Sequence, residues 1–205
     1  MRRVALAVAI LALGPVPTLA ADPRLDEVRA HFTVAQKPVP PEALGDLGAS
    51  DLADPGHSLR VAVDLLRAVG ADGYPGKIEV GEKGWVSQAK MAAGGQQSAE
   101  TIGYTFIGAT RSGLLVTLSA FWGGGSGHFY TLQILDAGIG HAFDEEGRPY
   151  ERLTLTAIRN ISLGDRWQGS VTISGDSLVV VTKPGEPNNG QAEPSTQTIR
   201  AVRPD

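Results

Sequence analysis

The chain has 205 residues, a formal net charge of −4 at pH 7, and no cysteine. Without cysteine it forms no disulfide, carries no cysteine-linked lipid anchor, and has neither a zinc–thiolate site nor a thiol nucleophile. The acidic side chains are scattered and no basic stripe occurs, which argues against nucleic acid or anionic lipid as a partner. This length is sufficient for a full hydrophobic core without cross-links.

The first twenty residues predict a secretory signal peptide. Arg2 and Arg3 precede an apolar run over 4–13, and residues 18–20 have the small-x-small pattern of a cleavage site. The run is about half as long as a membrane-spanning helix requires. Cleavage after Ala20 would leave 185 residues and, because two basic residues and no acidic ones are removed, a net charge of −6. We expect an exported, soluble protein of the periplasm or extracellular space, without stable membrane insertion.

The region before residue 70 predicts two short helices joined by a loop. Asp22-Pro23 is an N-cap followed by proline at the first helical position, and apolar side chains then recur at helical spacing to about His31. Several prolines predict a surface loop over 36–53. A second cap-and-proline pair, Asp54-Pro55, predicts a helix over 56–69, although the valines in it leave a strand open.

From Lys77 onward the pattern is typical of an antiparallel sheet. Turn residues recur about every ten positions, and the segments between them are rich in Val, Ile, Leu, Thr and aromatic residues. We expect a mostly β (α+β) fold, with a sandwich- or barrel-like antiparallel sheet of about seven to nine strands after one or two short N-terminal helices. Strands are expected near residues 77–81, 84–91, 101–110, 114–122, 128–136, 150–160, 169–174 and 177–183.

Two hairpins can be assigned a register, with turns at Gly175-Asp176 and Ser112-Gly113. The first turn would pair Ile173 with Leu178 and Val171 with Val180, and the second would pair Ile107 with Leu118 and Ala109 with Val116. We expect one β-rich domain, with its N-terminal helical segment, over 21–183. A flexible polar tail is expected over 184–205, with an edge strand left open near its end.

The stretch from Phe121 to Tyr130 places a glycine-rich loop between two aromatic pairs. It lacks the lysine of a P-loop and the glycine spacing of a dinucleotide site, so we expect no cofactor. One interpretation is a flexible lip that stacks on a sugar ring or a peptide. The other is a wide hairpin with ordinary cross-strand aromatic pairs. The Asp165-Arg166-Trp167 segment also has two interpretations: Arg166 holds a carboxylate while Trp167 stacks on a ligand, or Asp165 and Arg166 form a turn and Trp167 closes one end of the sheet. The candidate ligand-binding residues are Trp122, Ser126, His128, Tyr130 and Trp167.

The sequence gives weaker indications of a metal site or a catalytic site than of a binding loop. Residues His128, Asp136, His141 and Asp144 have ligand-type side chains, but along a strand His128 and Asp136 would lie roughly 26 Å apart, at about 3.3 Å per residue. The acidic run over 144–146 is typical of a solvated turn. We therefore predict neither a metal site nor a catalytic residue. The segment Asn160-Ile161-Ser162 matches a glycosylation sequon.

Three functions remain open. The pattern favours a non-catalytic exported protein that binds a protein or glycan ligand in the cell envelope. The first alternative is an envelope-acting hydrolase that uses Ser126, His128 and either Asp144 or Asp165, because a nucleophile needs an adjacent base and an orienting acid. The second alternative is an inhibitor or immunity protein, which rests on fold-level association alone.

Overall fold

The structure is a computed structural model that describes residues 22–49, 61–70, 73–91, 97–184 and 194–203. The predicted signal peptide, the first residues of the predicted helix over 56–69, and half of the predicted polar tail lie outside the described residues. The signal peptide and the division into one domain and a tail therefore stay predictions.

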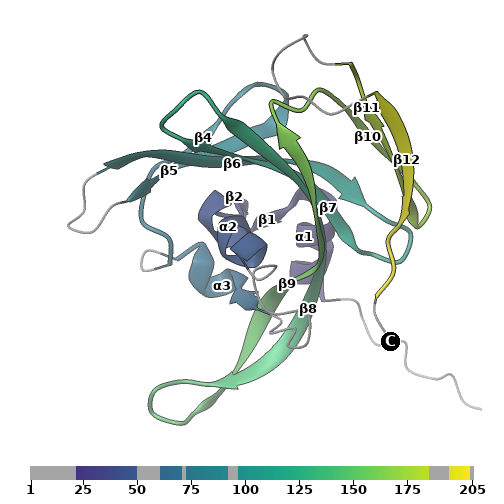
Figure 1. Ribbon diagram of the computed structural model, residues 1–205. Coiled ribbons are helices and arrows are strands. Elements are labelled where there is room, and N and C mark those ends of the chain that lie inside the picture. Colours follow the sequence, from purple (N-terminus) through teal and green to yellow (C-terminus); the bar gives the residue numbers. More distant parts are fainter. Residues whose placement is uncertain (1–21, 50–60, 71–72, 92–96, 185–193, 204–205) are drawn as a thin grey trace, which may run out of the picture.

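A strongly curled antiparallel sheet of seven strands forms the body of the molecule (Figure 1). Its strands lie in the order β3-β9-β8-β7-β6-β5-β4, so consecutive strands are neighbours everywhere except at β3. The predicted mostly β, antiparallel fold with short helices is confirmed. The strands are β3 (Ala62–Asp64), β4 (Ile78–Val80), β5 (Trp85–Met91), β6 (Gln97–Ala109), β7 (Leu115–Gly123), β8 (His128–Phe143) and β9 (Pro149–Asp165).

A second, three-stranded sheet packs on the outer, convex face of the curl (Figure 1). It consists of β10 (Gly169–Ser174), β11 (Ser177–Thr182) and β12 (Ser195–Arg200). The predicted register of the first hairpin is confirmed, because Ile173 pairs with Leu178. The final strand, β12, pairs with β11 at the edge of this sheet. It lies in the part of the predicted tail for which an edge strand was an alternative. The apolar layer between the two sheets is formed by Leu114, Val116, Leu132, Ile134, Trp167, Leu178, Val180, Ile199 and Ala201.

Three short helices fill part of the concave face: α1 (Pro23–His31), α2 (Pro41–Ala49) and α3 (Leu65–Ala68). The predicted α1 is confirmed, and the Asp22 side chain caps it by accepting a hydrogen bond from the Arg24 main chain. A small ladder of β1 (Thr33–Val34) with β2 (Lys37–Pro38) follows it, and a 3-10 turn over Glu82–Gly84 leads into β5. The concave core is formed around Val28, Phe32, Leu44, Leu47, Leu65, Tyr104, Leu115, Leu135, Leu153 and Leu155.

Two expectations about the N-terminal region are wrong. The expected loop over 36–53 contains α2, which begins at Pro41 and buries Leu44 and Leu47 against the sheet. Proline is well tolerated in a first helical turn, so the prolines mark where this helix starts. In the expected helix over 56–69, the described residues form the edge strand β3 and then only one helical turn, α3, which the Asp64 side chain caps.

The predicted register of the second hairpin is also wrong. Ala109 pairs with Leu115 instead of Val116, and Leu118 pairs with Thr105 instead of Ile107. A β-bulge between Phe106 and Gly108 leaves an extra residue on β6. Because a bulge changes which face the following residues occupy, Ala109 packs in the concave core while Ile107 packs in the convex layer.

Strands β8 and β9 are longer than expected. They pair to Phe143 and Pro149 and so form a two-stranded ribbon that extends beyond the rest of the sheet (Figure 1). Alternate residues of β8 face opposite sides: Leu132 and Ile134 lie in the convex layer, whereas Leu135 lies in the concave core. This alternation places Phe129, Thr131 and Gln133 on the concave face.

Candidate functional site

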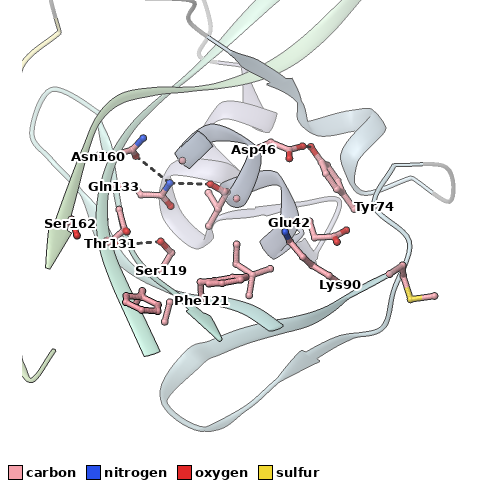
Figure 2. Close-up of a pocket in the computed structure, with 17 residues that line it drawn as sticks. Glu42, Asp46, Tyr74, Lys90, Ser119, Phe121, Thr131, Gln133, Asn160 and Ser162 are labelled. Carbon is pink, nitrogen blue, oxygen red and sulfur yellow. Dashed lines mark hydrogen bonds between the residues drawn. The ribbon is translucent and has the colours of Figure 1, made fainter. Parts of the chain in front are cut away.

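A cavity of about 890 Å³ lies between α2 and the concave face of strands β5 to β9 (Figure 2). Its lining has three parts. Hydroxyl and amide side chains from β7, β8 and β9 form one end, and charged side chains from α2 and β5 form the other. Apolar side chains, with Phe121 between the two ends in the view of Figure 2, form the wall. A mostly apolar concavity with a few placed polar groups is the usual form of a small-molecule site.

The amide end fixes α2 to the sheet. The Gln133 side chain is only 1% exposed, and its Nε2 donates to the Leu44 carbonyl at 3.1 Å and to Asn160 Oδ1 at 3.3 Å. Asn160 Nδ2 in turn donates to the Leu47 carbonyl at 3.1 Å. These bonds join the main chain of α2 to side chains of β8 and β9. The cavity is therefore preformed by buried hydrogen bonds.

Gly45 lies where α2 meets β6. A Cβ atom at this position would lie 2.9 Å from Ile102 Cδ1, so the end of the Ile102 side chain would have to shift to make room for it. Gly45 and Gly48 are also weak helix formers, which is why composition alone did not suggest α2.

The apolar wall contains an aromatic pair. Phe121 of β7 lies directly opposite Phe129 of β8 in the antiparallel ladder. Phe129 is 55% exposed although it lines the cavity. An exposed phenyl ring inside a concave site leaves apolar surface in contact with water, and a bound apolar molecule would cover it.

The charged end lies where α2 faces β5. Glu42 and Asp46 are one helical turn apart, and the Tyr74 hydroxyl donates to Asp46 Oδ2 at 2.7 Å. Lys90 Nζ lies 3.4 Å from Glu100 Oε2 and 5.6 Å from the Phe121 ring centroid. Burial raises the pKa of Glu42, and the neighbouring Asp46 raises it further, whereas Lys90 and a hydrogen bond from the Met91 main chain oppose the change.

The five candidate residues named from the sequence lie away from this cavity. Trp122 and His128 are cross-strand neighbours whose rings meet edge to face at 5.5 Å, and Trp85 meets Trp122 at 5.8 Å. Because these side chains alternate with Phe121 and Phe129 along their strands, they lie on the opposite, convex face. They form the cross-strand pairs of the simpler interpretation, and a role in binding stays a prediction.

Tyr130 and Trp167 belong to the convex apolar layer. Their ring centroids lie 6.3 Å apart, and Trp167 is only 8% exposed. Trp167 Nε1 donates to Thr182 Oγ1 at 3.0 Å, which ties the connection after β9 to the three-stranded sheet. This buried position gives Trp167 a packing role.

The loop with Ser126 is attached through its main chain. The Arg166 guanidinium donates to the Ser126 carbonyl at 3.1 and 2.8 Å, and Asp165 Oδ1 accepts from the His128 main-chain N–H at 2.7 Å. The Asp165 contact is therefore to the backbone of His128, whereas an orienting acid would bond the imidazole ring. Asp144 lies at the far end of β8, in the turn of the extended ribbon, where it accepts bonds from Arg148.

Asp136 and Asn160 have structural partners. Asp136 accepts two hydrogen bonds from the Arg203 guanidinium, both at 2.8 Å. Among the described residues, no group of three or more His, Asp or Glu side chains is placed to hold a metal ion. In the sequon, the Asn160 amide nitrogen that would carry a glycan is hydrogen-bonded to α2.

Sequence reasoning did not find the cavity, although a signal was present. On β7 and β8 the residues Thr117, Ser119, Thr131 and Gln133 are polar, while residues further along the same face, Leu115 and Leu135, belong to the core. Polar side chains on a core-facing row indicate either buried hydrogen-bond partners or a cavity. In this protein the row has both, because Gln133 is hydrogen-bonded to α2 and also lines the cavity.

No protein-family model, curated protein or solved structure matches this chain. Within the described part of the chain, every helix is too short or too polar to cross a membrane.

Proposed function

We propose that this protein is an exported, non-catalytic binding protein whose ligand is a small, largely apolar molecule held in the concave cavity. The observation that carries the proposal is the cavity of about 890 Å³, with its apolar wall and exposed Phe129. Its volume lies within the range of about 300–1,000 Å³ that is usual for ligand sites. Export to the periplasm or the extracellular space rests on the leader sequence.

Two features support a binding role. The amide bonds from Gln133 and Asn160 hold α2 in place before any ligand arrives, so little ordering free energy opposes binding. The candidate catalytic side chains of the hydrolase alternative lie outside the cavity lining, because Ser126 and His128 are not among its residues.

A second candidate is recognition of a glycan or protein by the convex face. The supporting observation is the aromatic row of Trp85, Trp122 and His128, which come from three strands and contact one another. Aromatic faces stack on sugar rings and anchor protein partners. The edge-to-face contacts in this row use part of the ring surface, so we rank this candidate below the cavity.

The test is a fluorescence titration of the mature protein with the neutral apolar dye N-phenyl-1-naphthylamine. Thr131→Phe and Ser162→Phe each place a ring in the cavity from neighbouring strands, and Trp122→Ala changes the convex face instead. We expect each cavity-filling variant to bind at least tenfold more weakly than the wild type, a loss of about 1.4 kcal/mol, and Trp122→Ala to bind as the wild type does.

Far-UV circular dichroism and a thermal melt of each variant show that it is folded. Equal dye affinity in the wild type and both cavity-filling variants would contradict the proposal. A loss of affinity in Trp122→Ala alone would transfer the binding site to the convex face.

A further inference from the structure

The two ends of the cavity differ in charge. The charged side chains among the described lining residues are Glu42, Asp46 and Lys90, and all three lie at the α2 end. The ammonium of Lys90 already pairs with Glu100, a carboxylate outside the lining, at 3.4 Å. Among these described side chains there are three carboxylates and one ammonium, so their summed charge is negative.

Glu42 is a partly buried carboxylate at this end. Burial is the main cause of its raised pKa, and Asp46 contributes in the same direction as a like charge. The groups that oppose this effect are Lys90 and the main-chain N–H of Met91. A charged group in a partly desolvated position is stabilised by an opposite charge, and among the described lining residues Lys90 provides it while also pairing with Glu100.

The adjoining wall points independently to a ligand with an apolar part. Phe129 lines the cavity and is 55% exposed, and Phe121 lies opposite it on the next strand. The Phe121 ring also lies close to a positive charge, because Lys90 Nζ is 5.6 Å from its centroid. The face of an aromatic ring attracts cations, so this wall accepts an ammonium group as well as a hydrocarbon chain.

We infer that the ligand is an amphiphile with a cationic, amine-type head group, which lies between Glu42, Asp46 and Phe121 while the hydrocarbon part covers Phe129. This inference rests on the proposed function, since it names the ligand class for the same cavity. An anionic head group would meet two carboxylates, the partly buried Glu42 and the exposed Asp46, and would be repelled. Lys90 does not outweigh these two carboxylates, because its ammonium is shared with the carboxylate of Glu100.

The test compares three probes with the same chain length: decylammonium, decanoate and the neutral 1-decanoylglycerol. Isothermal titration of the mature protein at pH 7.5 measures each affinity below the concentration at which micelles form. We expect decylammonium to bind at least tenfold more tightly than 1-decanoylglycerol, and decanoate to bind most weakly. Higher salt should reduce the preference for decylammonium, because screening weakens charge–charge attraction.

The variants remove charge at matched positions. Glu42→Gln with Asp46→Asn keeps the shape of the α2 end and should reduce the affinity for decylammonium to that for 1-decanoylglycerol. The control is Glu79→Gln, which removes a carboxylate from β4, outside the lining of this cavity, and should leave the preference unchanged.

The outcomes separate the inference from the proposed function. Equal affinity of the wild type for decylammonium and 1-decanoylglycerol would overturn the cationic head group and leave the apolar cavity site in place. Tightest binding of decanoate would overturn it in favour of an anion held by Lys90. If none of the three probes binds, the proposed function fails together with the inference.

Discussion

The two faces of the curled sheet are covered in different ways. The convex face is covered by a second sheet, and the layer between them is built from apolar side chains such as Leu132 and Val180. The concave face is covered by helices, and four polar side chains of the sheet are buried there: Gln88, Thr117, Ser119 and Gln133.

The difference follows from how each cover is joined to the curled sheet. The three-stranded sheet pairs its own N–H and C=O groups between its strands, and it meets the curled sheet through apolar side chains. The helix α2 is joined to the curled sheet by hydrogen bonds as well, because Gln133 and Asn160 donate to main-chain carbonyls of α2, and the cavity lies beside these bonds. A polar row on a core-facing side of a sheet can therefore mark the place where a helix is hydrogen-bonded to it.

The largest expected effect tests whether both layers are parts of one core. Leu132 and Leu135 are both fully buried, one in the convex layer and one in the concave core. We expect Leu132→Ala and Leu135→Ala each to lower the free energy of unfolding by about 2–5 kcal/mol, as leucine truncations in a packed core do. Denaturant unfolding measures both. A loss below about 1 kcal/mol for Leu132→Ala alone would show that the three-stranded sheet does not share the core.

An intermediate effect tests the amide attachment of α2. Gln133→Leu removes the donor to the Leu44 carbonyl and leaves that carbonyl and the Asn160 amide oxygen without it. We expect a loss of about 1–3 kcal/mol, because an unsatisfied buried polar group costs more than a hydrogen bond contributes. Thermal unfolding measures the effect. Unchanged stability would indicate that α2 is held by its apolar contacts alone.

A smaller effect is expected at a single buried hydroxyl on the same face. Tyr104 is 2% exposed, and its hydroxyl donates to the Val39 carbonyl at 2.8 Å. Tyr104→Phe keeps the ring and its edge contact with Phe32 and removes one donor from the buried Val39 carbonyl, whereas Gln133→Leu removes two bonds. We expect a loss of about 1–2 kcal/mol in urea unfolding. A loss as large as that of a leucine truncation would mean that the hydroxyl also orders the segment before α2.

The smallest expected effect is a dependence on pH. The folded state raises the pKa of Glu42 above its unfolded value, so ionisation of this group opposes folding. This cost is absent below the ordinary carboxyl range and develops as the pH rises through the raised pKa. We therefore expect Glu42→Gln to be more stable than the wild type at pH 7, with the difference smaller at pH 4. Melting curves at both values measure it, and an equal difference at both would contradict the assignment.

Local features were predictable from the sequence, whereas features that combine distant segments were not. The register of β10 with β11 followed from a two-residue turn, because such a turn leaves one pairing that keeps the apolar residues together. The register of β6 with β7 did not, since a bulge near Ile107 breaks the alternation on which the prediction relied. The cavity combines α2 with five strands, so no single segment contained it.

The aromatic loop shows that residues close together in the sequence need not identify the face that holds a cavity. Trp122, His128 and Tyr130 were prominent because they lie close together in the sequence. Alternation along a strand then places them on one face and the less prominent Phe121, Phe129 and Thr131 on the other. Which of these faces is hollow depends on what covers it, and that is decided by α2 and by β10 to β12.

The most direct test of the central claim is a set of ¹H–¹⁵N correlation spectra of the mature protein during a titration with N-phenyl-1-naphthylamine. A ligand in the concave cavity should shift the amide signals of Gly45, Ile102, Thr131 and Gln133 and leave the indole N–H signals of Trp122 and Trp167 in place. Shifts confined to those indole signals, with the cavity amides unchanged, would contradict the account.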